Sequence, residues 1–473
     1  MMATENDVKR VLDDSKINQI LLRTQQSSRG EIRAILKKAK KKRGLTLSEV
    51  GTLCNCHDQL LEKEIFATAG QIKSEIYGER LVLFAPLYIS DFCVNDCEYC
   101  GFHTRSQTPR RKLSMQELAS QVKILIDMGH KRLLLEFGEH PKENPISYVE
   151  KCISKIYSVR SKNGSIRRVN VNIAATSTAN YKKLKDAGIG TYQLFQESYH
   201  RPTFSKMHHG PKAEYERQLF AHDRAFAAGI DDLGIGVLFG LYDWRYEVMA
   251  LVSHAKYMDK TFGVGPHTIS VPRFQEAEGV DFKPPFPVSE DELLKAIAIL
   301  RLSVPYTGMI ISTRERPEVR SKAFEIGISQ SSSASRVEVG GYQGRGTDTG
   351  TTKGHPDEPG QFSIHDGRTL DQMVISLCKE GLLPSFCTAC YRSGRTGREF
   401  MSIAKPGNIH NFCRPNAILT FKEYLLDYAS AESKKAGQKV IEKYLNLIPS
   451  KKVKQKTIER LSFLEQGERD LYF

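Results

Sequence analysis

The chain has 473 residues, of which 40% are hydrophobic, and a formal net charge of +14. This length suffices for two or three domains, or for one large barrel with appendages. No apolar run approaches the ~18 residues that span a bilayer, and residues 1–10 lack the apolar segment of a secretory signal. We therefore expect a cytoplasmic protein with no membrane partner.

The positive charge does not by itself indicate nucleic-acid binding. Part of the excess lies in one lysine-rich run, residues 37–43. Nucleic-acid-binding proteins interleave basic residues with exposed aromatics or contain a recognisable module, and neither is present here. The run is typical of a solvated helix end before Gly44, so we expect no nucleic-acid partner.

Three regions follow one another along the chain. Residues 1–78 are predicted to form a helical extension, in which Ser28 and Glu31 fit a capping box. Residues 79–337 alternate apolar runs with amphipathic segments, and residues 338–473 hold a Gly/Thr-rich linker (339–354) followed by helices. The expected strands are 81–89, 132–137, 168–174, 190–196, 233–239, 267–272, 309–314 and 328–333. The expected helices are 114–128, 145–159, 181–187, 212–228, 289–302, 370–380, 416–431 and 438–447.

The middle region predicts an α/β fold. Strands separated by helical crossovers form parallel sheets, and eight such repeats over about 250 residues are typical of a closed, TIM-type (β/α)8 barrel. Two of the expected helices begin with capping boxes, at Ser114 and Ser289. Barrels of this kind bind ligands at the carboxyl ends of their strands.

Six of the ten cysteines fall into two groups, which indicates metal binding rather than a disulfide scaffold. The first group is Cys93, Cys97 and Cys100, with C-x3-C-x2-C spacing, directly after the first expected strand. Three thiolates can hold three corners of a cubane iron–sulfur cluster and leave the fourth iron open to a small ligand. Zinc sites usually close with four ligands in C-x2-C pairs, which this loop does not supply.

The second group is Cys387, Cys390 and Cys413, with C-x2-C-x22-C spacing. It again supplies three thiolates and leaves one cluster iron uncommitted. His410 could instead complete a Cys3His zinc site, and this alternative stays open. Residues 338–473 are thus expected to form an auxiliary, mainly helical, cluster-binding domain.

Taken together, these motifs resemble the HydG family, the radical SAM (S-adenosylmethionine) tyrosine lyases that mature FeFe-hydrogenase and belong with the 2-iminoacetate synthase-like enzymes. The resemblance covers C-x3-C-x-Y-C, the full barrel, C-x2-C-x22-C and the terminal Gly-Glu-Arg-Asp-Leu-Tyr-Phe. The first motif alone marks only the radical SAM superfamily. The thiamine-pathway tyrosine lyase shares the barrel chemistry, but its resemblance weakens at the second cysteine group.

The resemblance implies a reaction and its cofactors, namely two 4Fe–4S clusters, the second with an extra iron, and SAM. A 5′-deoxyadenosyl radical made from SAM takes a hydrogen atom from the amino group of L-tyrosine. The Cα–Cβ bond then breaks to give p-cresol and dehydroglycine, and dehydroglycine becomes carbon monoxide and cyanide at the second cluster for assembly of the hydrogenase H-cluster. The implied partners are a reductant such as ferredoxin or flavodoxin and other hydrogenase maturation proteins.

Two alternative functions remain at this point. A thiamine-pathway lyase would make the same cleavage and release dehydroglycine (2-iminoacetate). A non-catalytic iron–sulfur or zinc scaffold would carry metal without cleaving SAM. A tunnel that carries dehydroglycine through the barrel is a further hypothesis, because the two cysteine groups bracket the barrel in the sequence.

Five residues are predicted to contact SAM. Tyr99 lies between two cluster cysteines and is expected near the adenine, or packed beneath the loop. Glu136 and Gly138 follow the second strand, where a glycine lets backbone carbonyls approach the SAM ammonium group. Glu197 and Arg217 are expected to contact the ribose or the carboxylate.

Three residues are predicted to orient tyrosine, by analogy with aromatic amino acid lyases. Arg314 ends the seventh expected strand and could bind the carboxylate with its guanidinium fork, or could instead pair with Glu315 or Glu318. Tyr88 could form a wall of the pocket. Ser331 lies in the eighth strand, where it could alternatively close the barrel floor.

One histidine is predicted to bind the extra iron. The resemblance places His267, at the start of the sixth strand, in this role, and a neutral imidazole is a reasonable donor for iron. A histidine that is merely hydrogen-bonded at the barrel end is the alternative.

Overall fold

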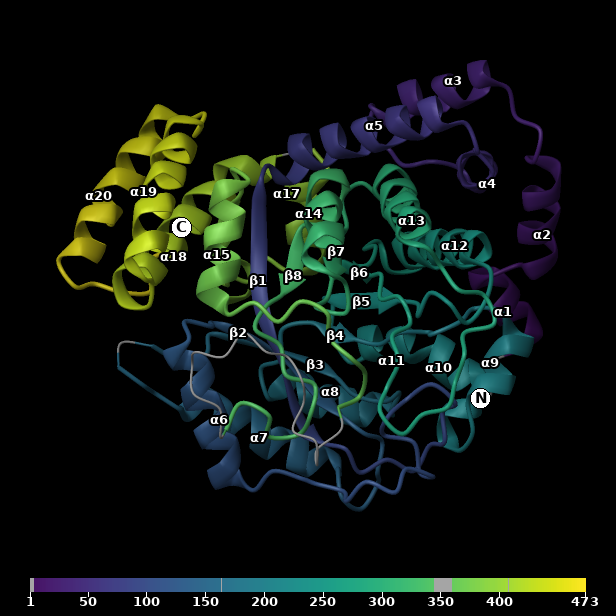
Figure 1. Ribbon diagram of the computed structural model, residues 1–473, viewed down its shortest axis with the longest axis horizontal. Coiled ribbons are helices and arrows are strands. Elements are labelled where there is room, and N and C mark those ends of the chain that lie inside the picture. The colour runs from purple at the N-terminus through teal and green to yellow at the C-terminus, as the bar shows by residue number, and fades with distance from the viewer. Residues whose placement is uncertain (1–3, 163, 344–359, 407) are drawn as a thin grey trace.

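The computed structural model describes residues 4–162, 164–343, 360–406 and 408–473 (Figure 1). Eight parallel strands close a barrel in sequence order, because β1 pairs with both β2 and β8, and this confirms the predicted (β/α)8 fold. A ninth strand, β9, pairs in parallel with the start of β1. The strands are β1 Arg80–Ser90, β2 Arg132–Phe137, β3 Arg168–Asn172, β4 Tyr192–Gln193, β5 Leu233–Gly236, β6 Thr268–Ser270, β7 Gly308–Ile311, β8 Gln330–Ser332 and β9 Leu383–Ser385.

Helices surround the barrel. They are α6 Met115–Asp127, α7 Ile146–Ser158, α8 Thr178–Asp186, α9 Arg201–Met207, η1 Pro211–Ala213, α10 Tyr215–Leu219, α11 Ala221–Ala227, α12 Trp244–Phe262, α13 Glu290–Ser303 and α14 Pro317–Ile326. The capping boxes predicted at Ser28, Ser114 and Ser289 are all formed. The predicted helix 212–228 is wrong as one element, because the chain there divides into η1, α10 and α11.

Helix α12 was not apparent from the sequence. Twelve of its 19 residues are buried, so it lacks the broad polar face that marks an amphipathic helix. The helix lies between the barrel and the N-terminal helices, with contacts to α2, α4 and α13. Burial on two sides explains its apolar sequence.

The N-terminal region is helical, as predicted, and packs on α12, α13 and α14. Its helices are α1 Glu5–Val11, α2 Asp14–Arg23, α3 Arg29–Ala39, α4 Leu47–Cys54 and α5 Gln59–Tyr77. In Figure 1 helices α2 to α5 run over the upper right of the barrel. Helix α5 leads directly into β1.

The C-terminal region joins the barrel through β9, which the sequence did not predict. Its helices are α15 Leu370–Lys379, α16 Ala389–Arg392, α17 Gly397–Ala404, η2 Asn408–Asn411, α18 Cys413–Asp427, α19 Ala431–Asn446 and α20 Lys451–Glu465. Helices α18, α19 and α20 pack together beside the barrel (Figure 1). Most of the expected linker 339–354 lies outside the described residues.

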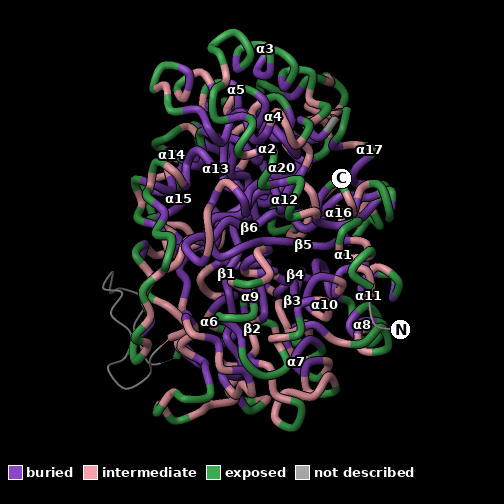
Figure 2. The backbone as a smooth tube through the Cα atoms, turned by 90° about the vertical axis from the view of Figure 1, so that its right-hand side faces the viewer, coloured by how far each residue is buried: buried purple, intermediate pink, exposed green. Residues whose placement is uncertain are grey.

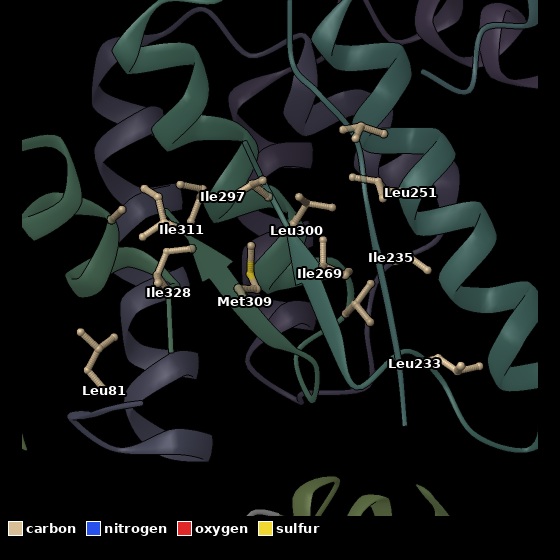
Figure 3. Close-up of a cluster of buried hydrophobic side chains, with 14 of the residues drawn as sticks. Leu81, Leu233, Ile235, Leu251, Ile269, Ile297, Leu300, Met309, Ile311 and Ile328 are labelled. Carbon is tan, nitrogen blue, oxygen red and sulfur yellow. The ribbon is translucent and has the colours of Figure 1, made fainter. Parts of the chain in front are cut away.

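The core lies between the outer face of the strands and the helices. Figure 3 shows strand residues such as Ile269 and Met309 beside Ile297 and Leu300 of α13, and Figure 2 shows that the strands are mostly buried. One connected hydrophobic core contains side chains from all three predicted regions, whose boundaries stay a prediction. Within the described part of the chain, none of the helices combines the length and apolar character that crossing a bilayer requires.

Candidate active site

Two cavities lie at opposite ends of the barrel, and strands β1, β2, β7 and β8 contribute residues to both. We call them the upper cavity, at the carboxyl ends of the strands, and the lower cavity, at the amino ends. On β1, Arg80 lines the lower cavity and Tyr88 lines the upper one. On β8, Gln330 lines the lower cavity and Ser332 lines the upper one. Because alternate residues of a strand face the same side, one inward face supplies both sites.

An apolar layer lies inside the barrel between the two cavities. It consists of Phe84, Leu134 and Ile310, which form a small buried cluster. These side chains line the upper cavity, and among the described residues the two cavities share no lining side chain. This layer lies on the direct path that the predicted tunnel would take between the two cavities.

The first cysteine group lies where the sequence predicts, at the upper rim. Cys93, Cys97 and Cys100 line one pocket that adjoins the upper cavity. Neighbouring loops hold their loop by backbone hydrogen bonds: the amide of Val94 donates to the Glu139 carbonyl (2.7 Å) and that of Glu98 to the Met207 carbonyl (3.1 Å). The three thiols are thus presented together by a loop fixed on both sides.

Asn95 is a site residue that sequence reasoning missed, although it lies within the cysteine motif. Its amide group donates to the Glu139 carboxylate (2.7 Å), and its carbonyl accepts from the backbone amide of Lys212 (2.9 Å). Arg217 binds the same Glu139. Asn95 therefore joins the cysteine loop to both neighbouring loops.

Gly138 lines the same pocket, and only glycine fits there. A Cβ atom at this position would lie 2.4 Å from the carbonyl oxygen of Phe92 and 3.1 Å from the Cβ of Cys93. The Gly138 amide donates to the Ser90 carbonyl (2.8 Å). The close approach keeps the β2 loop against the cysteine loop, and the side-chain amide of Asn144 donates to the Gly138 carbonyl (2.7 Å) and the Phe92 carbonyl (3.1 Å) across this contact.

Acidic and basic side chains meet where this pocket opens into the upper cavity. Glu197 forms an ion pair with Lys212 (2.8 Å), and the hydroxyl of Tyr99 lies 2.9 Å from His208 Nε2. Glu197 has a φ of +66°, a conformation that non-glycine residues adopt rarely and mostly at functional sites. Burial raises the pKa of Glu136 well above its usual range, although the nearby Arg314 acts in the opposite direction.

Arg314 lines the upper cavity without an ion pair. Its guanidinium lies over the ring of Phe362, 3.2 Å from the centroid, and no described carboxylate forms a salt bridge with it. Glu315, a predicted alternative partner, is bound by Arg273 (2.5 Å). A half-buried guanidinium with free donors is suited to a carboxylate ligand.

Tyr88 lines the same cavity and is held by Gln361, a residue that no sequence pattern indicated. Its hydroxyl donates to the side-chain carbonyl of Gln361 (2.9 Å), and burial raises its pKa. The Gln361 amide nitrogen lies 3.8 Å from the sulfur of Cys100. Gln361 thus connects the tyrosine to the cysteine pocket across a long separation in sequence.

Two predicted residues do not reach the cavities. The Ser331 hydroxyl accepts from Arg320 (2.6 Å) and donates to the Ile311 carbonyl (3.0 Å), so it faces the outside of β8, and Ser332 lines the cavity instead. Arg217 binds Glu139 and the carbonyl of Ala175, behind the pocket wall. Its place in the pocket is taken by Lys212.

The second cysteine group lines the lower cavity, at the opposite end of the barrel from the first. Cys387 follows β9, Cys390 lies on α16 and Cys413 begins α18. All three cysteines line this one cavity. Pairing of β9 with β1 brings these residues beneath the barrel.

His267 lines the lower cavity with this group, whereas His410 does not. Burial lowers the pKa of His267 to about 4, so the imidazole is neutral, and its Nδ1 lies 3.6 Å from the Asp232 carboxylate. The ring nitrogens of His410 lie 2.8 Å from the Glu75 carbonyl and 3.0 Å from Arg414. With both nitrogens engaged, His410 is not available to complete a zinc site.

The residues at both sites fit an iron–sulfur cluster better than a single metal ion. Each site brings three free cysteines to one pocket, whereas no group of three His, Cys, Asp or Glu side chains among the described residues is arranged to hold one ion. In the lower cavity, the Nε atoms of Arg80 and Arg132 are buried without a hydrogen-bond partner. These cations suit a group that carries several thiolates.

Comparison with known proteins gives two family matches. Residues 87–252 match the radical SAM superfamily, and residues 270–383 match the Biotin and Thiamin Synthesis associated domain. The 2-iminoacetate synthase of Salmonella typhimurium is 30% identical over 318 residues, which cover 67% of this chain and 80% of that protein.

Two solved structures resemble the chain over nearly its full length. A crystal structure of HydG, a maturase of the FeFe-hydrogenase, has a TM-score of 0.93 and 51% identity and covers 98% of this chain and 100% of that chain. HydG from Carboxydothermus hydrogenoformans has a TM-score of 0.83 and 37% identity, with 96% and 99% covered.

Proposed function

The chain belongs to the HydG family of radical SAM enzymes, and we propose that it cleaves the Cα–Cβ bond of L-tyrosine to p-cresol and dehydroglycine. Dehydroglycine is then converted to carbon monoxide and cyanide for assembly of the FeFe-hydrogenase H-cluster. The observation that carries this proposal is the pair of three-thiol sites at opposite ends of one barrel.

The upper site is suited to the cofactors of the family, a 4Fe–4S cluster and SAM. Cys93, Cys97 and Cys100 would each hold one iron, and the fourth would be left to SAM. When bound, the reduced cluster supplies the electron that cleaves SAM to methionine and a 5′-deoxyadenosyl radical. Gly138 and the Glu197–Lys212 pair would bind the charged ends of SAM, and Tyr99 would lie beside the adenine.

The upper cavity is suited to a zwitterionic substrate. Arg314 would bind the carboxylate of tyrosine through two parallel hydrogen bonds. Glu136, whose pKa is raised by burial, would accept a hydrogen bond from the amino group or from SAM. Tyr88 and Ser332 would close the pocket and keep water from the reacting bond.

The lower cavity would hold the second cluster through Cys387, Cys390 and Cys413, with His267 as a ligand of the extra iron. The nearby Asp232 carboxylate would keep Nδ1 protonated, so that Nε2 is the donor. The proposal includes an electron donor such as ferredoxin or flavodoxin, other hydrogenase maturation proteins as partners, and a cytoplasmic location.

An anaerobic assay with dithionite, SAM and tyrosine tests this function. We expect 5′-deoxyadenosine, p-cresol, carbon monoxide and cyanide, together with iron and sulfide counts that correspond to two clusters. A protein that binds metal but forms neither 5′-deoxyadenosine nor p-cresol would be a scaffold. If Cys387→Ala and Cys413→Ala leave the yield of carbon monoxide intact, the maturase function is wrong, and release of dehydroglycine, as in the thiamine-pathway enzyme, is the alternative.

A further inference from the structure

The walls of the lower cavity carry cations without anions. Arg80 and Arg132 both line it, as do His267 and the second cysteine group, whereas no aspartate or glutamate among the described residues does. The upper cavity, by contrast, contains Glu136 and Glu197. A buried positive charge without a partner is costly, so an unmatched pair of guanidinium groups indicates a bound anion.

Of the two arginines, Arg80 has the side chain with fewer hydrogen-bond partners. It lies at the start of β1, and its Nε is buried without a hydrogen-bond partner. Among the described residues its guanidinium forms no salt bridge and no hydrogen bond. The Cζ atom of Arg80 lies 5.8 Å from the centroid of the Tyr77 ring. The group is therefore free to bind a ligand in the cavity.

Arg132 is fixed in place, with one edge left free. Its two terminal nitrogens donate to the Cys387 carbonyl (2.8 Å) and to the Gln330 side chain (3.3 Å). Its Nε is buried without a partner. These bonds hold the guanidinium beside the cysteine loop.

An oxidised cluster alone does not account for both charges. Three thiolates on an oxidised cubane, whose core is dicationic, leave a net charge of about −1. One guanidinium balances that charge, and the second remains. The excess favours a further small anion next to the cluster.

We propose that Arg80 and Arg132 form a carboxylate-binding subsite in the lower cavity, which holds dehydroglycine next to the second cluster. This inference rests on the proposed function, because the carboxylate is the one made from tyrosine. Dehydroglycine that is not held reacts with water, HN=CH–COO⁻ + H2O giving OHC–COO⁻ + NH3, and leaves as glyoxylate. The subsite thus decides between conversion at the cluster and loss by hydrolysis.

A binding measurement tests the subsite without turnover. Glyoxylate, the stable oxygen analogue of dehydroglycine, is titrated by calorimetry into the cluster-loaded protein. Saturating SAM and tyrosine, without reductant, occupy the upper cavity so that Arg314 does not bind the probe. Glycolaldehyde, which has the aldehyde but no carboxylate, is the control ligand.

We expect Arg80→Met to weaken glyoxylate binding about tenfold, which is the effect of losing one charge-assisted contact, and Arg80→Lys to weaken it less. The matched control is Arg414→Met. Arg414 adjoins Cys413 but bonds to His410 and the Leu447 carbonyl, away from the cavity. The Arg414→Met substitution removes the same charge near the cluster, and we expect glyoxylate binding to stay at the wild-type value.

Product partition gives a second readout. In Arg80→Met the ratio of carbon monoxide to p-cresol should fall, and glyoxylate should rise to match. The proposal is overturned if Arg80→Met binds glyoxylate as tightly as wild type, if glycolaldehyde binds equally well, or if the variant has lost iron and sulfide, which would make Arg80 a counter-charge for the cluster. A wild-type protein that binds glyoxylate but forms no p-cresol would overturn the proposed function and leave the subsite standing.

Discussion

The upper and lower cavities share strands β1, β2, β7 and β8 but differ in charge and in how they are closed. The upper cavity combines Arg314 with Glu136 and Glu197 and is covered by loops that follow the strands. The lower cavity has arginines and a histidine, and β9 and α16 close it. A zwitterion suits the first and an anion the second. One barrel can therefore support two different reaction steps, because different residues of the strands line its two ends.

The largest expected effect separates the two cysteine groups. Cys97→Ser should reduce formation of 5′-deoxyadenosine and p-cresol by about a thousandfold or more, because the remaining two thiols no longer hold the cluster that reduces SAM. Cys390→Ser should reduce p-cresol only a few-fold while abolishing carbon monoxide. Chromatography of the organic products and haem trapping of carbon monoxide measure both. Equal loss of all products in the two variants would contradict the division.

A histidine pair sharpens the description of the lower cavity. His267→Ala should lower bound iron by about one atom per chain and suppress carbon monoxide strongly, because the imidazole is the proposed ligand of the extra iron. His410→Ala, whose ring is engaged by Glu75 and Arg414, should retain the wild-type iron content. Iron analysis of the two variants side by side measures this difference. A loss of iron in His410→Ala would indicate that His410 is the fourth ligand of a Cys3His site.

Arg314 tests the upper cavity. Arg314→Met should raise KM for tyrosine roughly a hundredfold, which corresponds to about 3 kcal/mol for a lost, buried, charge-assisted contact. Arg316→Met is the control, because this exposed side chain pairs with Glu290 outside the cavity. Initial rates of p-cresol formation against tyrosine concentration provide the comparison. An unchanged KM in Arg314→Met would remove Arg314 from the substrate site.

The apolar layer tests how the cavities communicate. Leu134→Phe should lower the ratio of carbon monoxide to p-cresol severalfold, because a larger side chain blocks passage between the cavities, whereas Leu134→Ala should not. Overpacking costs about 1–3 kcal/mol, so a thermal denaturation curve must show that the variant is folded. Identical ratios in both variants would mean that dehydroglycine takes another route.

The smallest effect concerns a buried carboxyl that supports the loop after β4. Glu247 accepts from the Tyr199 amide (2.9 Å) and the Ser198 hydroxyl (2.5 Å), and burial raises its pKa to about 7. Since the folded state keeps a proton that the unfolded state releases, stability should fall by about 1 kcal/mol between about pH 6 and about pH 8. Glu247→Gln should remove this dependence. Denaturation midpoints of both proteins at the two pH values measure it, and equal slopes would count against the raised pKa.

Much of the fold and both cysteine groups could be predicted, because their signals are local. Strand β2 begins and ends at the predicted residues, and the capping boxes at Ser114 and Ser289 start helices as expected. The spacing of Cys93, Cys97 and Cys100 fixes three thiols within one loop. Periodicity, capping and short spacing depend on neighbouring residues alone.

Other parts of the site depend on contacts between distant segments. The register of β8 with β1 and β7 decides which of its residues face the inside of the barrel. In this register Ser332 faces the cavity and Ser331 faces away from it. Gln361 reaches Tyr88 only after the chain has passed around the barrel. No local pattern encodes either contact.

The sequence by itself determined the barrel, its two sets of thiols and the chemistry they support, because residue type and spacing carry that information. Only the tertiary structure decided that Lys212 rather than Arg217 lines the upper pocket, and that Arg80 and Arg132 face the second set of thiols. The reason is barrel closure. When β1 pairs with β2, β8 and β9, it brings together residues that lie some 300 positions apart, such as Arg80 and Leu383. The energy of that pairing depends on both segments and cannot be predicted from either one alone.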